Sequence, residues 1–153
     1  MNTAIIGLGS NIQPGKNLPD ALRKLKEHTD ILAVSSIWQT TAVGTEGPSF
    51  MNAAALIMTP LDREQLKTEV LGKIEKELGR VRVADKFAPR TIDLDILTFN
   101  QEILDKNIFF HDYLILPAAE ILPELIDPQT NRSLGDLARE RCCGSNAVNL
   151  GKL

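Results

Sequence analysis

The pattern of apolar and polar residues along the chain predicts four main β-strands, at residues 3–8, 31–39, 50–58 and 91–99. Apolar residues at helical spacing predict two amphipathic helices between these strands, at 19–28 and 61–78. The remaining expected elements are a short returning strand and two short helices, at 102–104, 114–121 and 133–141. The resulting order β-α-β-β-α-β is typical of an α+β, ferredoxin-like fold with a mainly antiparallel sheet.

The chain has 153 residues, which suits one domain, and we expect this domain to span residues 1–143 with a loose polar tail at 144–153. A formal net charge of -3 argues against a protein that coats nucleic acid, because such proteins usually carry a basic excess. No apolar run approaches the roughly 20 residues that cross a bilayer, and the N-terminus lacks a signal-peptide pattern. We therefore expect a cytoplasmic monomer or weak homodimer that binds small molecules, with no nucleic-acid or membrane partner.

Asp93 and Asp95 stand two positions apart in the strand predicted at 91–99, so both side chains point to one face of it. Their negative charges repel each other at this distance, and a nearby positive charge is needed to offset the repulsion. One explanation is a solvated strand face on which the aspartates pair with arginines. The other is a Mg²⁺ site, because Mg²⁺ commonly takes one or two carboxylates and completes its coordination with water and phosphate oxygens.

A basic segment, GRVRVADKFAPR at residues 79–90, leads directly into this strand. Against the single acid Asp85 it carries four basic residues, Arg80, Arg82, Lys86 and Arg90. Such runs are usually solvated surface, but next to a metal site they supply the forked donors that a triphosphate requires. The chain has neither a G-x-x-x-x-G-K-[ST] nor a G-x-G-x-x-G motif, so this segment is the candidate phosphate site.

Four further positions could contact a ligand, although each also has an ordinary structural explanation. Asn52 lies in an apolar strand, where its amide either bonds within the core or offers a donor and an acceptor to a heterocycle. Phe50 and Phe87 are of a type found more often in the core than stacked on ligands. His111 could act as a base or contact a phosphate, but an ordinary surface histidine is the simpler interpretation.

Taken in this order and spacing, the segments GLGSN, TTAVG, FMNAA, GRVR and APRTIDLDIL resemble the 6-hydroxymethyl-7,8-dihydropterin pyrophosphokinase family of folate biosynthesis. The resemblance runs from about Asn2 to Asp127, and its most specific element is R-x-R followed by P-R-T-I-D-L-D-I. The later segment LPAAEILPEL, at residues 116–125, supports it. The resemblance implies a ferredoxin-like α/β/α sandwich that moves the terminal pyrophosphate of ATP onto the hydroxymethyl oxygen of the pterin and releases AMP.

By this resemblance, Asp93 and Asp95 would hold two Mg²⁺ ions, and ATP would be the co-substrate. The residues implied in catalysis are Arg80, Arg82, Arg90 and Asp95. Those implied in ATP binding are Glu75, Arg82, Arg90, Ile96 and His111. Those implied in pterin binding are Thr40, Val43, Phe50, Asn52 and Asp93.

The chain departs from the family pattern after His111, where its segment is several residues shorter. No arginine occurs in the sequence between Arg90 and Arg132, whereas the family's segment contributes an arginine that closes on ATP. We therefore expect weaker capture of ATP, with His111 as the remaining contact. Two alternatives stay open: a homologue that binds pterin and ATP with weak or lost turnover, and another two-metal enzyme such as a nucleotidyltransferase.

Overall fold

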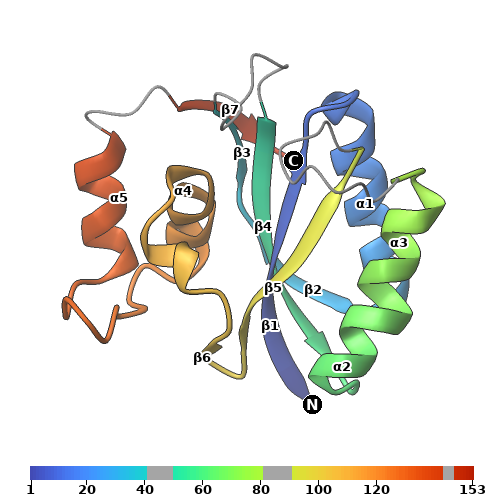
Figure 1. Cartoon of the computed structure of the whole chain (residues 1–153), viewed down its shortest axis with the longest axis horizontal. Helices are drawn as coiled ribbons and strands as arrows, with labels where there is room; N and C mark the ends of the chain where they lie inside the picture. The colour runs from blue at the N-terminus through green and yellow to red at the C-terminus, as the bar shows by residue number, and fades with distance from the viewer. Residues whose placement is uncertain (41–49, 81–90, 143–146) are drawn as a thin grey trace.

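The structure, a computed structural model, describes residues 1–40, 50–80, 91–142 and 147–153. These residues form a seven-stranded sheet with helices on both faces (Figure 1). The strands are β1 (Asn2–Ser10), β2 (Asp30–Val34), β3 (Ser36–Thr40), β4 (Phe50–Thr59), β5 (Asp93–Phe99), β6 (Glu102–Ile103) and β7 (Val148–Lys152). Their order is β6-β5-β1-β4-β3-β7, with β2 also paired to β4, and each of these pairs is antiparallel. The predicted α/β/α sandwich with a mainly antiparallel sheet is confirmed.

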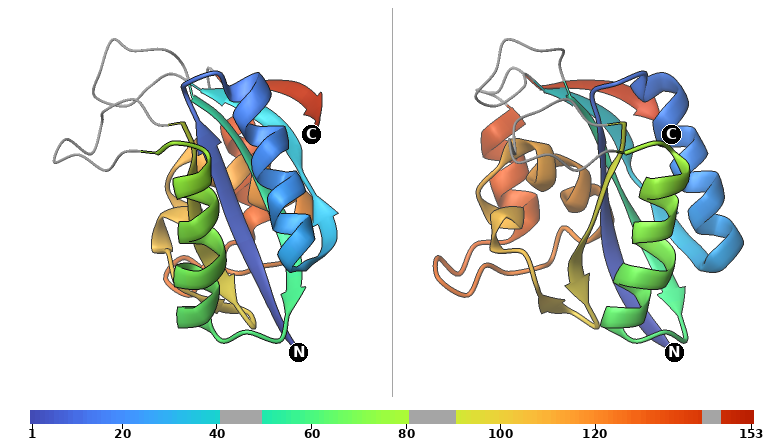
Figure 2. Two further views of the ribbon diagram at one scale, coloured as in Figure 1. Left: turned by 90° about the vertical axis from the view of Figure 1, so that its right-hand side faces the viewer. Right: turned by 45° about the vertical axis from the view of Figure 1, so that its right-hand side comes forward.

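Two helical layers enclose the sheet, as the turned views of Figure 2 also show. One layer holds α1 (Pro14–His28) and a continuous helical segment made of α2 (Arg63–Gln65), the π-helix η1 (Leu66–Leu71) and α3 (Gly72–Glu77). The other holds the 3-10 helix η2 (Lys106–Phe109), α4 (Asp112–Ile121) and α5 (Leu134–Cys142). Within the described residues, none of these helices has the length and apolar character needed to cross a membrane.

Each face of the sheet is buried under one helical layer, so the central strands are apolar on both faces. Ala4, Ile6 and Leu8 of β1 belong to the core that α1 and α3 cover. Ile5, between them in the sequence, belongs to the core under α4, together with Leu97 of β5. This double burial explains why β1 reads as a continuous apolar run instead of an alternating one.

The strand predicted at 31–39 is in fact two strands, because the buried Ser35 interrupts it. The hydroxyl of Ser35 accepts a hydrogen bond from the Ala54 N–H at 2.8 Å and donates one to the Ser36 carbonyl at 2.8 Å. The serine side chain therefore takes over pairing that a regular strand would make with its backbone. The first helix also differs, since it begins at Pro14, where proline fits because the first helical N–H needs no partner.

The second predicted helix is confirmed, and its first turn has a capping box. The Gln65 N–H donates to Asp62 Oδ1 at 2.8 Å, and the Asp62 N–H donates to Gln65 Oε1 at 3.1 Å. Gly72 follows the π turn, where a Cβ would lie 3.2 Å from the Lys67 carbonyl oxygen. Beyond this point Glu75 faces inward and is only 5% exposed, which places a carboxylate between α3 and the sheet.

The expectation of a loose tail at 144–153 is wrong for its last residues. β7 pairs antiparallel with β3 and extends the sheet by one strand, with Asn149 opposite Trp38 and Val148 opposite Gln39. All five residues of β7 are exposed. Backbone hydrogen bonds hold the strand in place, so its sequence shows no apolar alternation by which it could be recognised.

Candidate functional site

The two aspartates and Asn52 lie on one face of the sheet, on either side of a glycine in β1. Gly9 pairs with Asp93 of β5 on one side and with Asn52 of β4 on the other. Directly opposite residues point to the same face, so Asn52 and Asp93 face the same side, about 10 Å apart across two strand spacings. Gly7 stands in the same way between Asp95 and its β4 partner. Gly7 and Gly9, here called the glycine floor, add no side chain of their own to this strip, so that Leu97 lies against Gly7 and Asn52 against Gly9.

Gly9 permits an unusually close approach of the asparagine amide. A Cβ at Gly9 would lie 2.7 Å from Asn52 Oδ1, which is too close for two non-bonded atoms. Asn52 itself is 7% exposed. The amide is therefore held low against the sheet, with its polar edge toward the glycine floor.

Arg80 joins the end of α3 to the start of β5. Its Nη1 donates to Asp93 Oδ1 at 2.7 Å and also to Glu75 Oε2. The Leu94 backbone N–H donates to the same Glu75 oxygen at 3.0 Å. The Arg80 and Glu75 side chains are 9% and 6% exposed, so this ion pair is shielded from water and its geometry is rigid.

The surroundings of Asp95 disfavour its ionised form. Burial alone would lower the pKa of Arg80, but the charges of Asp93 and Glu75 and their hydrogen bonds raise it, so Arg80 remains a cation. Although Asp95 reaches solvent, desolvation by the surrounding protein, with the charges of Asp93 and Glu75, raises the pKa of Asp95 to about 7. A carboxylate that resists ionisation in this way favours a bound cation.

Three buried side-chain polar atoms in the described part of the chain have no hydrogen-bond partner: Asn52 Nδ2, Arg80 Nε and Thr91 Oγ1. All three lie at the Asp93 end of the sheet: Arg80 is bonded to Asp93, Thr91 is two residues before it, and Asn52 is on the far side of Gly9 from it. Buried polar atoms are rarely left unpaired, and each costs about 1–3 kcal/mol. Their concentration at one end of the sheet indicates a site for a polar ligand.

The structure also places two more of the predicted pterin residues beside Asn52 and adds one that the sequence analysis missed. Thr40 of β3 pairs with Phe50 of β4, and Trp38 pairs with Asn52, so these four side chains share one face of the sheet. Trp38 is 9% exposed. The sequence could have indicated Trp38, because it lies two residues before Thr40 in a predicted strand and both side chains therefore point to one face.

Other predicted residues are not brought to the aspartates. Ile96 packs into the core on the α1 and α3 side, opposite to the face of Asp93 and Asp95. His111 precedes the first turn of α4, is exposed, and stacks on Tyr113 with ring centroids 5.2 Å apart. An arginine does approach this segment in space, because Arg141 of α5 donates to the Phe110 carbonyl at 3.2 Å.

The remaining predicted site residues, Val43, Arg82 and Arg90, lie outside the described residues. Among the residues that are described, no group of three or more His, Cys, Asp or Glu side chains is arranged to hold a metal ion. Asp93 and Asp95 supply two carboxylates, one fewer than such a group requires.

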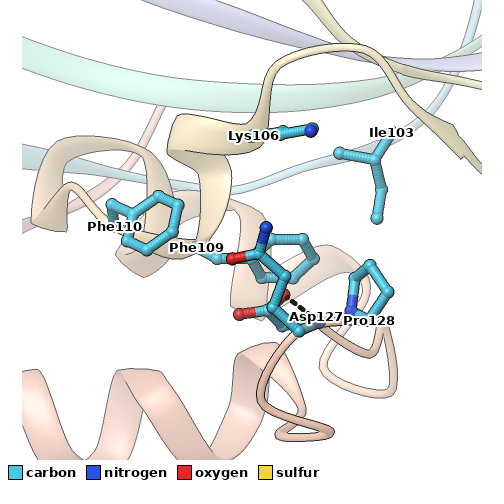
Figure 3. A pocket seen from close by; sticks show the side chains of 7 residues that line it. Ile103, Lys106, Phe109, Phe110, Asp127 and Pro128 are labelled. Atoms are coloured by element: carbon cyan, nitrogen blue, oxygen red, sulfur yellow. Dashed lines mark hydrogen bonds between the residues drawn. The ribbon is translucent and has the colours of Figure 1, made fainter.

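A cavity of about 280 Å³ lies elsewhere, between the β6–η2 segment and the loop that precedes α5 (Figure 3). Its lining residues are Ile103, Lys106, Phe109, Phe110, Asp127, Pro128 and Gln129. None of the predicted site residues lines this cavity, and Asp127 is engaged in bonds from the Gln129 N–H and the Thr130 hydroxyl. We therefore take the glycine floor and the residues beside it as the candidate functional site.

The fold and site define a ferredoxin-like α/β/α protein with a carboxylate and arginine centre of the kind used to transfer phosphate groups. The family profile described as 7,8-dihydro-6-hydroxymethylpterin-pyrophosphokinase (HPPK) matches residues 5–123. The chain belongs to this family.

Curated relatives span most of the chain. The 2-amino-4-hydroxy-6-hydroxymethyldihydropteridine pyrophosphokinase of Haemophilus influenzae is 34% identical over 142 residues, which cover 85% of this chain and 88% of the relative. That of Bacillus subtilis is 37% identical over 136 residues, which cover 81% and 80%. The solved structure of wild-type Plasmodium falciparum HPPK-DHPS shares the fold, with a TM-score of 0.70 and 13% identity over 92% of this chain. This chain spans 43% of that longer chain.

Proposed function

We propose that this chain transfers pyrophosphate from ATP to the hydroxymethyl oxygen of 6-hydroxymethyl-7,8-dihydropterin, releasing AMP, in folate synthesis. Membership of the pyrophosphokinase family supports this reaction. The observation that carries it is the placement of Asp93 and of Asn52, whose amide nitrogen has no partner, on one face with only Gly9 between them. The chain is an ATP-dependent pyrophosphokinase with a carboxylate side for the nucleotide and an amide side for the heterocycle.

The pterin binds over β3 and β4 in this proposal. Asn52 offers a donor and an acceptor to the ring edge, and its Nδ2 has no other partner. Thr40 and Phe50 stand beside it on the same face. Asp93 bounds the pocket across the glycine floor, and Val43 completes the proposed set.

ATP binds on the β5 side. Arg80 is fixed by Glu75 and Asp93, and its unpaired Nε is a donor for a phosphate oxygen. Arg82 and Arg90 add the charge that a triphosphate needs. Two further proposed contacts, Ile96 and His111, complete the ATP set; the side chain of Ile96 packs on the opposite face, so its contact would use the backbone.

The residues at β5 fit Mg²⁺. Asp93 and Asp95 present hard oxygen ligands on one strand face, and the raised pKa of Asp95 reflects desolvation together with neighbouring negative charge, which a cation would offset. We propose that these two carboxylates hold two Mg²⁺ ions. Mg²⁺ bound there would neutralise charge on the phosphates as it shifts from the β-phosphorus toward the departing AMP.

The protein's own part in the reaction is positioning and fixed charge. The hydroxymethyl oxygen loses its proton to solvent and forms a bond to the β-phosphorus of ATP, and the bond from that phosphorus to the bridging oxygen breaks, so that this oxygen and its electron pair leave with AMP. Asn52 and the glycine floor hold the pterin alcohol on one side, while rigid Arg80 meets the phosphate oxygens on the other. Little covalent work is required of any side chain.

The test is release of AMP from ATP and Mg²⁺, measured with and without 6-hydroxymethyl-7,8-dihydropterin. The proposal expects AMP only when the pterin alcohol is present, in equal amount to the pterin diphosphate. Binding of both ligands without AMP would support a homologue that has lost turnover. AMP release that ignores the pterin would instead favour a different two-metal enzyme.

We also propose that the chain acts as one domain, which the pairing of β7 with β3 extends beyond the expected residues 1–143, in the cytoplasm and as a monomer or weak homodimer. Its small-molecule partners are pterin and ATP. The net charge of -3 supports the absence of a nucleic-acid partner. Sedimentation at micromolar concentration tests the oligomeric state.

A further inference from the structure

A carboxylate near the end of α4 is bonded to the strand that borders the proposed pterin site. Glu120 Oε2 accepts from the Ser36 N–H at 3.1 Å and from the Trp38 indole N–H at 2.8 Å. Glu120 Oε1 accepts from the Ser36 hydroxyl at 2.8 Å. The ammonium of Lys152, on β7, lies 3.9 Å from the same Oε1. Three donors on β3 therefore converge on one side chain of another layer.

Trp38 links this carboxylate to the pterin residues. It lies directly opposite Asn52, and on the same face the next pair is Thr40 and Phe50. Three of these four positions belong to the proposed pterin set, and Trp38 is the fourth. With 9% of its surface exposed, the indole forms a wall beside Asn52, whose amide nitrogen has no partner.

The orientation of that wall depends on Glu120. An indole ring can turn about two side-chain torsions, and its N–H normally finds a partner when it is buried. A charged acceptor gives a stronger and shorter bond than a neutral one, so Glu120 holds the ring in one orientation. Removal of the carboxylate would leave the Trp38 and Ser36 donors without their partner and release the ring.

We propose that Glu120 is a positioning residue for pterin binding, which acts through the indole of Trp38. This inference rests on the proposed placement of the pterin beside Asn52. It makes α4, an element that contributes no residue to the proposed pterin pocket, a determinant of pterin affinity.

The experiment compares KM for the pterin alcohol and for ATP, together with the melting temperature, in a set of variants. In Glu120→Ala, KM for the pterin should rise about tenfold, as for loss of one charge-assisted bond, while KM for ATP changes less than about twofold. Trp38→Phe keeps an aromatic ring and loses the N–H, so it should show a smaller rise of the same kind. Glu120→Gln keeps an acceptor for the indole and should restore KM to within about twofold. Glu124→Ala, an exposed glutamate just beyond α4, is the matched control and should behave as the unaltered protein.

The double variant Glu120→Ala with Trp38→Phe separates positioning from general stability. If Glu120 acts through Trp38, KM for the pterin in the double variant should be no higher than in whichever single variant has the higher KM. Additive losses of pterin affinity in the double variant, or equal rises in KM for pterin and ATP, would overturn the proposal. Glu120 would then only stabilise the fold. If Glu120→Ala does not fold, Trp38→Phe alone still tests the proposal. An unchanged KM for pterin in Trp38→Phe would overturn the coupling between Glu120 and Trp38.

Asn52→Ala shows which proposal has failed when the result is negative. If Asn52→Ala raises KM for pterin and Glu120→Ala does not, the role of Glu120 is refuted and the site stands. If Asn52→Ala also leaves KM for pterin unchanged, the pterin does not bind beside Asn52, and both proposals are refuted.

Discussion

The proposed site depends on the absence of a side chain at Gly9. It separates Asp93 from Asn52 in the pairing of β5, β1 and β4, and no side chain rises between them. The close contact that a Cβ would make is with the amide oxygen of Asn52, which is the movable end of a side chain. A substitution here should therefore disturb the ligand contact more than the fold.

We predict that Gly9→Ala raises KM for the pterin alcohol about tenfold, because the Asn52 amide must rotate away from its position. The free energy of unfolding should fall by about 1 kcal/mol or less, since the strand backbone can accommodate alanine. Gly7→Ala is the control, because its Cβ would lie 3.3 Å from Leu97 Cδ1 in the core. A larger effect of Gly7→Ala than of Gly9→Ala on pterin KM would contradict this account.

Asp95 should make the metal-free protein less stable as the pH rises. Its pKa in the folded chain is about 7, above the ordinary 3.8, so between about pH 4 and 7 the folded state retains a proton that the unfolded state has lost. The free energy of unfolding therefore decreases through this range, and the full penalty is present above pH 7. Because Asp95 reaches solvent, screening reduces the penalty to about 1 kcal/mol.

Asp95→Asn is accordingly predicted to stabilise the protein at pH 8 by about 1 kcal/mol and to have no such effect near pH 4. Urea denaturation in EDTA at both pH values measures the difference. Asp30→Asn, at the exposed start of β2, is the matched control. A gain of the same size at both pH values would show that ionisation of Asp95 is not the cause.

At the scale of elements, the end of α3 is attached to the start of β5 through Glu75. This buried carboxylate accepts from Arg80 and from the Leu94 backbone N–H, so one side chain orients both the arginine and the strand that carries Asp93. Breaking a buried ion pair on one side is expensive, because the other charge is left without its partner.

Glu75→Gln should therefore lower the free energy of unfolding by about 2–3 kcal/mol and reduce turnover through misplacement of Arg80. Glu77→Gln is the control on the same helix: Glu77 pairs with Lys24 at the surface, and that hydrogen bond lowers its pKa. Thermal melting should distinguish them, with little change for Glu77→Gln. Equal melting temperatures for the two variants would refute the role of Glu75 as the link.

At the scale of the whole molecule, the proposed site draws on β1, β3, β4, β5 and the end of α3, so ligand binding should stabilise the fold as a unit. We predict that Mg²⁺ with a non-hydrolysable ATP analogue, at about 100 times Kd, raises the melting temperature by roughly 5 °C or more. In Asp95→Ala the rise should vanish while the ligand-free melting temperature is unchanged or higher. A full rise in EDTA, without Mg²⁺, would argue against the carboxylates as metal ligands.

What the sequence determined by itself was local or periodic. The alternation within β5 was enough to place Asp93 and Asp95 on one face, because the geometry of a strand repeats every two residues. The spacing of apolar residues likewise identified the main helices and the order of the elements, and a characteristic run of motifs identified the family. These features depend on neighbours in the chain.

Tertiary structure decided the contacts between distant segments. Glu120 meets Trp38 although 82 positions separate them, and no pattern around either residue signals that contact. β7 was mistaken for a loose tail because its partner strand, not its own exposed side chains, makes it a strand. The role of the glycine floor depends on the position of β1 between β4 and β5, which only the folded sheet shows. In each case the deciding interaction is a hydrogen bond or a close approach across the sheet or between layers, and its energy depends on the partner that folding supplies.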